Sequence, residues 1–278
     1  MNENTTLLPG YSGCSVELHT DNDVKFVRKI SASEEYNPRL KAQIVKQKFF
    51  VHPTLKAPTI INEGYIDGLY YADMEYIPGK TVAELIRNQE FTIARMAIRK
   101  VMELFPTPTM MEDIDPMINN KEITQKLKEL KKSLAKYDAE EPCRKVLAQL
   151  EDVQWRTYYH PECEVHGDLT LENILVYQND VYLVDFLDVF HKSMETDMAK
   201  LLQDLACGWS FRREGLPTDS IKFLKESESR LYASHWMRTG DEPKTLESML
   251  ALTLLRIYPY LKDDATKEFL DRQLKTMF

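Results

Sequence analysis

Three oxygen-bearing side chains are closely spaced in the segment VHGDLTLENILVYQNDVYLVDFLD, residues 165–188. Asp168 follows a His-Gly pair, Asn173 comes five residues later, and Asp185 ends a run of apolar residues. Carboxylate and amide oxygens suit Mg²⁺, which prefers hard oxygen ligands. A carboxylate can also orient a hydroxyl group and accept its proton. Together the three residues indicate phosphoryl transfer from a nucleotide bound with a metal ion.

A β-hairpin between Asn173 and Asp185 accounts for their separation in the sequence. Residues 174–177 and 181–184 are rich in apolar and β-branched residues, and they flank a polar turn at residues 178–180. Two matched antiparallel strands, each rising about 3.3 Å per residue, return the chain to the level at which it started. We therefore expect Asn173 and Asp185 at the same end of the hairpin, within reach of one metal ion.

The segment before residue 78 is predicted to be a small antiparallel sheet that carries one helix. Residues 14–30 form two strands with a turn at residues 21–23, and a second hairpin turns at Asp67-Gly68. Between these hairpins, apolar residues recur at helical spacing over residues 38–51, with Pro38 near the start.

From Thr81 onward the pattern becomes mainly helical. Thr81 and Glu84 form a capping box before a helical region over residues 83–105. Further helices are predicted over residues 120–136, 141–153, 196–208, 218–238, 243–261 and 264–277. This order predicts an α+β fold with two lobes. The N-lobe comprises residues 1–77 and is an antiparallel β-sheet with one helix. The larger, mainly helical C-lobe comprises residues 78–278.

The motif HGDLTLEN…VDF resembles the catalytic segment of the protein-kinase-like superfamily. It is most similar to the aminoglycoside phosphotransferase and choline kinase branch, which carries His-Gly-Asp where protein kinases carry His-Arg-Asp. The resemblance implies a bilobal kinase-like fold and a phosphotransferase that uses ATP, or another nucleoside triphosphate, with Mg²⁺. In such a fold the N-lobe, residues 1–77, binds the nucleotide, and the C-lobe, residues 78–278, carries the catalytic loop and the acceptor site. The resemblance also implies that Asp168 is the catalytic base and that Asn173 and Asp185 bind the metal.

The same resemblance assigns His166 and Gly167 to the support of the catalytic loop. Asp197, near the start of a helix, resembles the aspartate that braces this loop in the family, although a first-turn acid favoured by the helix dipole is compatible with the same position. Asp188 is either a further metal ligand or a cap. Leu187 stands where protein kinases carry the glycine of a mobile loop, so we expect a metal loop with one fixed conformation.

The resemblance also implies that a nucleoside triphosphate binds the N-lobe. Lys25 and Lys29 compete for the phosphates, and we choose Lys29 because Val-Arg-Lys resembles the family's third-strand lysine motif. The usual helix glutamate is missing, so Gln43 or Gln47 takes its role, or an acid arrives from elsewhere. The remaining expected nucleotide contacts are Ser12, Gly13 and Ser15 at the phosphates, and Val27, Met74, Glu75 and Ile77 at the base.

The short segment between Asp185 and Asp197 lacks the peptide-docking region of protein kinases and favours a small acceptor with a hydroxyl group, such as a sugar or an amino alcohol. A protein kinase, a non-catalytic nucleotide-binding protein and an aminoglycoside-modifying kinase remain as alternatives. Acidic residues 111–115 could attract an amine, although a solvated loop is the simpler interpretation. Aromatic residues could hold a cationic acceptor, although we expect most of them to pack between helices: Trp209, Phe211, Tyr232, Trp236, Tyr258 and Tyr260.

Composition narrows the class of protein further. The chain has 278 residues and a net charge of −8, which disfavours a general nucleic-acid surface. Its four cysteines are scattered without a short pair, as suits a reducing cytoplasm. Apolar runs are too short to span a bilayer and the first residues lack a signal-peptide pattern, so we expect a cytoplasmic protein without membrane contact. The sequence sets no oligomeric state.

Overall fold

The computed structural model describes residues 4–8, 13–105, 121–136, 141–155, 157, 165–239 and 244–277. Its contacts separate into two compact units. Unit 1 is Met1–Thr81 with Asn173–Asp188, and unit 2 is Val82–Glu172 with Val189–Phe278. The hairpin that follows Asn173 is thus grouped with the N-terminal strands. The division of roles between a lobe of residues 1–77 and a lobe of residues 78–278 stays a prediction.

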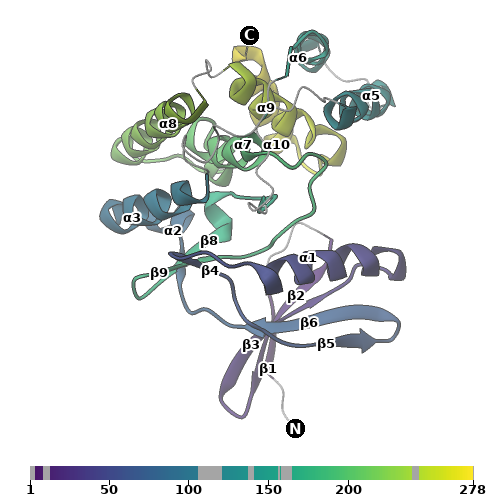
Figure 1. Cartoon of the computed structure of the whole chain (residues 1–278), viewed down its shortest axis with the longest axis vertical. Coiled ribbons are helices and arrows are strands. Elements are labelled where there is room, and N and C mark those ends of the chain that lie inside the picture. The colour runs from purple at the N-terminus through teal and green to yellow at the C-terminus, as the bar shows by residue number, and fades with distance from the viewer. Residues whose placement is uncertain are drawn as a thin grey trace. The chain divides into compact units, whose positions relative to one another are not determined.

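The main sheet of unit 1 has five antiparallel strands in the order β1-β2-β3-β6-β5 (Figure 1). They are β1 Asn4–Leu7, β2 Ser15–Asp21, β3 Val24–Ile30, β5 Ile60–Ile66 and β6 Leu69–Glu75. The two central hairpins close through pairs of residues with positive φ, Asn22-Asp23 and Asp67-Gly68. Such turns match the right-handed twist of the strands they join. The predicted hairpins are therefore present, and β1 adds an edge strand that the sequence pattern did not reveal.

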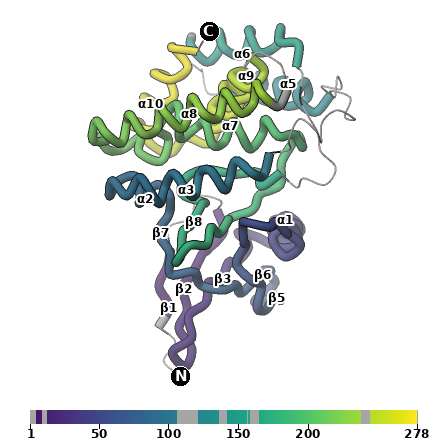
Figure 2. The backbone as a smooth tube through the Cα atoms, turned by 60° about the vertical axis from the view of Figure 1, so that its left-hand side comes forward, coloured from purple at the N-terminus to yellow at the C-terminus, as the bar shows by residue number. Residues whose placement is uncertain are grey.

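Helix α1, Asn37–Phe49, is the one helix of eight or more residues that the structure describes in unit 1, and it packs against β6. Figures 1 and 2 both show α1 beside the β5–β6 hairpin. Its buried residues Leu40 and Ile44 lie one helical turn apart and meet the apolar face of the sheet. The resulting core comprises Cys14, Leu40, Ile44, Tyr70, Ala72 and Met74.

A second, four-stranded sheet in unit 1 has the order β4-β9-β8-β7. The hairpin of β8 (Ile174–Tyr177) and β9 (Asp180–Leu183) forms its centre, and the two-residue strands β4 (Leu55–Lys56) and β7 (Lys80–Thr81) flank it. Gly79 precedes β7, and a Cβ atom there would lie 2.6 Å from the carbonyl oxygen of Val176. Glycine is therefore required for this close approach to β8.

Unit 2 is helical in its described residues. Its helices are α2 Val82–Arg87, α3 Phe91–Val101, α5 Lys121–Lys136, α6 Glu141–Glu151, α7 Met194–Leu205, α8 Thr218–Thr239, α9 Lys244–Leu255 and α10 Asp264–Thr276. Two predicted helices differ from the structure. The region 83–105 breaks between α2 and α3, where Gln89 adopts a φ of +59°. The helix predicted to end at residue 261 ends at Leu255, and Pro259 lies in the separate 3₁₀ turn that follows.

Helix α7 packs against both α8 and α9, and Figure 2 shows it running alongside α8. Every residue of α7 except Lys200 is buried. The predicted α+β fold, with an antiparallel sheet first and helices after it, is confirmed. Among the described helices, none combines the length and apolar character that crossing a membrane requires.

Candidate active site

The loop that carries Asp168 is fixed to helix α7 through its backbone. The N–H groups of His166 and Gly167 donate to the two carboxylate oxygens of Asp197, at 2.5 and 2.8 Å. Asp197 is 4% exposed, so these hydrogen bonds lie inside unit 2. Gly167 has a φ of +94°, a conformation that most residues with a Cβ avoid. The backbone before Asp168 is therefore held in one geometry.

Asp168 follows this anchored backbone and points its carboxylate toward α7. Its N–H donates to Nδ1 of His166 at 3.2 Å, so the buried imidazole stabilises the turn. Its Oδ1 lies 3.0 Å from Nζ of Lys200. Both side chains of this ion pair are mostly buried. The sequence analysis did not single out Lys200.

The end of the loop is held by a second buried carboxylate of α7. Asp204 accepts hydrogen bonds from the N–H groups of Leu171, at 2.7 Å, and Ser210, at 2.6 Å. Burial raises the pKa of Asp204 to about 6, although the hydrogen bonds from Leu171 and Ser210 oppose this shift. Arg87 adds a further support by donating to Glu172 at 3.0 Å and to Glu214 at 2.6 Å. Sequence reasoning missed these supports too.

In unit 1, the hairpin β8–β9 brings Asn173 next to the residue that precedes Asp185. Ile174 pairs with Leu183, and the N–H of Val184 donates to the carbonyl oxygen of Asn173 at 3.0 Å. Asp185 itself has a φ of +60°, which aspartate tolerates better than most residues, and its side chain is 34% exposed. The amide of Asn173 and the partly exposed carboxylate of Asp185 carry hard oxygen atoms of the kind that Mg²⁺ prefers.

Lys29 forms an ion pair with Asp185. Lys29 is 6% exposed, whereas Lys25 is exposed and lies over the ring of Tyr76. The two helix glutamines bind elsewhere. Gln43 donates to Asp188 at 3.2 Å, and Gln47 donates to the carbonyl oxygen of Pro58 at 2.8 Å. Of the partners considered for Lys29, the one seen in the structure is therefore an acid from outside helix α1, namely Asp185.

Asp188 is engaged by α1. Arg39 and Gln43 both donate to its Oδ1, at 2.7 and 3.2 Å, and Lys46 donates to the carbonyl oxygen of Leu187 at 2.8 Å. Partial burial would raise the pKa of Asp188, but the hydrogen bonds from Arg39 and Gln43 outweigh it, so that the pKa is lowered. The chain just after Asp185 is thus tied to a basic face of α1.

Other predicted nucleotide contacts lie on neighbouring strands of unit 1. Gly13 has a φ of +83°, and the hydroxyl of Ser15 donates to Glu17 at 3.0 Å. Ser12 is outside the described residues. Val27 pairs with Met74 across β3 and β6, and both contact the core of unit 1.

Beyond Met74, the chain leads toward the boundary of unit 1. The N–H of Glu75 donates to the carbonyl oxygen of Thr59 at 2.9 Å, so this donor is already engaged. Ile77 follows as a buried residue. The predicted contacts of Glu75 and Ile77 with a base therefore stay a prediction.

The aromatic residues of the C-terminal helices are divided among different surroundings. Phe211 and Tyr258 are buried, whereas Trp236 and Tyr260 are exposed. Trp209 meets the ring of Phe269 edge-on. The guanidinium of Arg212 lies over the Trp209 ring, 3.9 Å from the centroid of that ring. Acidic residues 111–115 lie outside the described residues.

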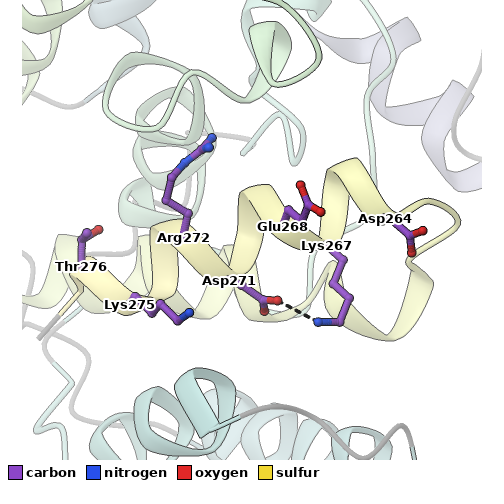
Figure 3. Close-up of a pocket in the computed structure, with 7 residues that line it drawn as sticks. All are labelled: Asp264, Lys267, Glu268, Asp271, Arg272, Lys275 and Thr276. Carbon is purple, nitrogen blue, oxygen red and sulfur yellow. Dashed lines mark hydrogen bonds and ion pairs between the residues drawn. The ribbon is translucent and has the colours of Figure 1, made fainter.

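A solvent-open hollow of about 690 Å³ follows one face of α10 (Figure 3). Both acidic and basic side chains line it, and Lys267 pairs with Asp271 at 2.8 Å. It contains no residue predicted for the active site. Across the described ranges, no group of three or more His, Cys, Asp and Glu side chains is arranged to hold a metal ion.

An antiparallel sheet carrying one helix, joined to a helical region with a His-Gly-Asp loop, defines the kinase-like class of phosphotransferases. Residues 5–234 match the model of the phosphotransferase enzyme family, and the chain belongs to this family. The resemblance predicted from the sequence is confirmed, as is the prediction of a phosphotransferase.

Solved structures share the fold at low sequence identity. A ternary complex of a thermostable mutant of aminoglycoside phosphotransferase APH(4)-Ia with ADP and hygromycin B is 12% identical, with a TM-score of 0.62 over 98% of this chain and 93% of that one. The gentamicin complex of APH(2")-IIa is 17% identical, with a TM-score of 0.60 over 100% and 93%. A protein from Haemophilus somnus 129PT assigned as a fructosamine-3-kinase is 13% identical, with a TM-score of 0.53 over 98% and 90%. No curated protein matches the chain in sequence.

Proposed function

We propose that the chain transfers the terminal phosphoryl group of ATP, or of another nucleoside triphosphate, to a hydroxyl group of a small molecule with the help of Mg²⁺. The ion pair between Lys29 and Asp185 carries this proposal. It brings together, within unit 1, the cation assigned to the phosphates and the acid assigned to the metal. A buried lysine on a strand has little other reason to reach a partly exposed aspartate 156 residues away.

In unit 1 we assign the nucleotide and the metal. Asn173 and Asp185 would hold Mg²⁺, which on binding would neutralise charge on the phosphate oxygens. Lys29 exchanges part of its interaction with Asp185 for the α- and β-phosphates. Gly13, Ser12 and Ser15 are assigned to the phosphates, which backbone N–H and hydroxyl groups can bind. The base is assigned to Val27, Met74, Glu75 and Ile77.

In unit 2 we assign the base of the reaction. Asp168 orients the acceptor hydroxyl and takes its proton as the acceptor oxygen bonds to the γ-phosphorus. The bond between that phosphorus and the β–γ bridging oxygen breaks, and the nucleoside diphosphate leaves with the electron pair. His166, Gly167 and Asp197 hold the loop, so that little reorganisation is needed at the moment of transfer.

For the acceptor we propose a sugar, an amino alcohol or a related metabolite. Eleven residues lie between Asp185 and Asp197, and helix α7 already begins at Met194. So short a connection supports a small acceptor over a peptide. The solved relatives include complexes with hygromycin B and gentamicin and an assigned fructosamine kinase. Aminoglycosides and sugar amines therefore belong among the acceptors to test.

The decisive experiment is ATP turnover with Mg²⁺ over a panel of alcohols, sugars, amino alcohols and aminoglycosides. We expect at least one acceptor to raise turnover above that with water. Asp168→Asn keeps the shape of the side chain but removes the base, so turnover should fall by about 100-fold or more. Nucleotide binding, followed as the thermal shift with Mg-ATP, should be retained.

Asp152→Asn provides the matched control, because Asp152 is an exposed aspartate of unit 2 just after α6. It should leave turnover unchanged. Full turnover in Asp168→Asn would remove Asp168 from the mechanism. A wild-type protein that binds Mg-ATP but phosphorylates no acceptor and does not hydrolyse ATP would support the non-catalytic alternative.

A further inference from the structure

Helix α7 presents three charged side chains to the catalytic loop from one face. Asp197, Lys200 and Asp204 stand at positions i, i+3 and i+7, which aligns them along the helix. At a rise of about 1.5 Å per residue they cover about 10 Å of α7. Their partners follow in the same order along the loop: the N–H groups of His166 and Gly167, the carboxylate of Asp168, and the N–H of Leu171. The loop therefore lies along α7 in register.

Lys200 differs from its two neighbours in what it holds. Asp197 and Asp204 bind backbone N–H groups, whereas Lys200 binds the side chain of Asp168 itself, at 3.0 Å. The side chains of Lys200 and Asp168 are 17% and 22% exposed, so solvent screens their attraction only in part. A second donor of the ammonium reaches Oε1 of Gln203 at 3.2 Å, which orients the amine from within α7.

A structural role alone explains this arrangement poorly. A buried ion pair seldom adds net stability, because removing two charges from water costs about as much as their attraction returns. Lys200 is also the one residue of α7 that is only partly buried, and its neighbours on the same face, Asp197 and Asp204, anchor backbone N–H groups. A lysine at this position fixes the direction of one carboxylate, that of Asp168.

We propose that Lys200 is a positioning residue for phosphoryl transfer: it keeps the Asp168 carboxylate directed toward the acceptor hydroxyl. The inference rests on the proposed function. Lys200 itself neither gives nor takes a proton in the step, since the hydroxyl proton passes to Asp168. The fixed N–O contact limits the rotamers from which Asp168 can work.

Lys200→Met tests the proposal because it keeps the stem and removes the charge. Turnover of Mg-ATP is measured with water as acceptor and with the best acceptor of the panel. We expect kcat to fall about 30-fold or more, within the usual contribution of a general base. KM for ATP should change by less than about threefold, because the ion pair acts in the transfer step rather than in nucleotide binding. Lys200→Arg keeps a cation, so its kcat should be about tenfold higher than that of Lys200→Met.

Lys222→Met is the matched control. Lys222 pairs with Asp219 at 3.5 Å on α8, but both side chains are about two-thirds exposed (69% and 68%). Its loss should leave kcat and KM unchanged. Circular dichroism and thermal unfolding confirm that each variant is folded. If Lys200→Met does not fold, the outcome is decided by kcat and KM for ATP in two other variants. These are Lys200→Gln, which keeps a hydrogen-bond donor without the charge, and Lys200→Arg.

A folded Lys200→Met with kcat within about twofold of the wild-type value would overturn the inference. So would a loss that falls on KM for ATP instead of kcat, or a loss of kcat that Lys200→Arg does not reduce. The proposed function fails separately, through full turnover in Asp168→Asn or absent turnover in the wild-type protein, and the inference then falls with it. An inactive Asp168→Asn beside a fully active Lys200→Met rejects the role of Lys200 alone.

Discussion

The loop of unit 2 that carries Asp168 and the predicted metal-binding end of unit 1 are held by different kinds of contact. In unit 2, buried carboxylates of Asp197 and Asp204 accept hydrogen bonds from backbone N–H groups. In unit 1, the charged side chains of Asp185 and Asp188 pair with Lys29 and Arg39, and both aspartate side chains are at least one-third exposed. One region is anchored through its main chain, the other through partly exposed ion pairs.

This difference suits the roles that we assign to the two regions. Backbone hydrogen bonds to buried carboxylates set the geometry of Asp168 before any substrate is present, as preorganised catalysis requires. An ion pair such as Lys29–Asp185 can be exchanged for contacts with ligands. A phosphate is negative and can replace Asp185 as the partner of Lys29, and a metal ion is positive and can replace Lys29 as the partner of Asp185. The following predictions test this contrast, beginning with the largest expected effect.

Replacing Asp197 should be the most destabilising change. Asp197→Ala leaves the buried N–H groups of His166 and Gly167 without their acceptor, at a cost of about 1–3 kcal/mol each. We expect the free energy of unfolding of unit 2 to fall by about 3 kcal/mol. The three tryptophans, Trp155, Trp209 and Trp236, all belong to unit 2, so tryptophan fluorescence during urea unfolding reports this unit selectively.

Asp219→Ala is the control for this change, because Asp219 is an exposed acid in the first turn of α8. An exposed acid there interacts with the helix dipole, which is worth about 0.5 kcal/mol, and its exposed pair with Lys222 adds little. Equal losses in the two variants would mean that Asp197 is an ordinary first-turn acid and that the main-chain anchoring of the loop contributes little.

The hairpins, including the one that follows Asn173, were largely predictable from the sequence, because short-range chemistry encodes them. Asp-Gly at residues 67–68 favours the positive φ values that a tight turn needs, and Asn22-Asp23 does the same. The matched lengths of β8 and β9 placed Asn173 and Asp185 at one end of a ribbon. The two-residue strands β4 and β7 were not predictable, because they are too short to show periodicity and pair with residues far away in the chain.

In unit 1, Asp185→Asn should change ligand binding more than stability. Asparagine tolerates the positive φ of this position, so the backbone is preserved while the charge is lost. We expect the affinity for ATP in the presence of Mg²⁺ to fall about tenfold, or about 1.4 kcal/mol, measured by calorimetric titration. With EDTA the affinity should stay the same or rise. Because Asp185 is partly exposed, the free energy of unfolding should change by less than about 1 kcal/mol.

Asp180→Asn is matched to this variant, since Asp180 lies in the same hairpin and pairs with a lysine, Lys56, at 2.6 Å. It should leave the magnesium dependence of ATP binding intact. If Asp185→Asn weakens binding equally with and without Mg²⁺, then Asp185 orients Lys29 and does not bind the metal, and the contrast between exchangeable and fixed contacts loses its basis.

The supports of the catalytic loop were less predictable than the loop itself. The spacing of Asp197, Lys200 and Asp204 shows that they share a helix face, but only the tertiary fold shows which loop that face meets. A usable signal was present, because charged residues in a helix that is buried on most sides require partners. Lys200 and Asp204 could have been selected on this ground, without their roles being known.

The smallest expected effect is the decrease in the free energy of unfolding that comes from burying the charge of Asp204. Burial raises the pKa of Asp204 to about 6, above its ordinary value of 3.8. Because the folded state then binds the proton more tightly than the unfolded state, protonation stabilises the fold, and this contribution is lost as the pH rises through about 6. From Asp204 alone, the free energy of unfolding should decrease by about 1 kcal/mol between pH 5 and pH 7.

Asp204→Asn isolates this contribution, because other carboxylates titrate equally in both proteins. The amide offers one acceptor to two N–H donors, those of Leu171 and Ser210, so the variant should be less stable by about 1–3 kcal/mol at pH 5. Its deficit should shrink by about 1 kcal/mol at pH 7, where ionised Asp204 destabilises only the wild-type protein. Asp219→Asn, at an exposed site, should show no such change. A deficit for Asp204→Asn that is constant from pH 5 to pH 7 would mean that Asp204 stays ionised throughout, and that a buried carboxylate can hold this loop without a cost in charge burial.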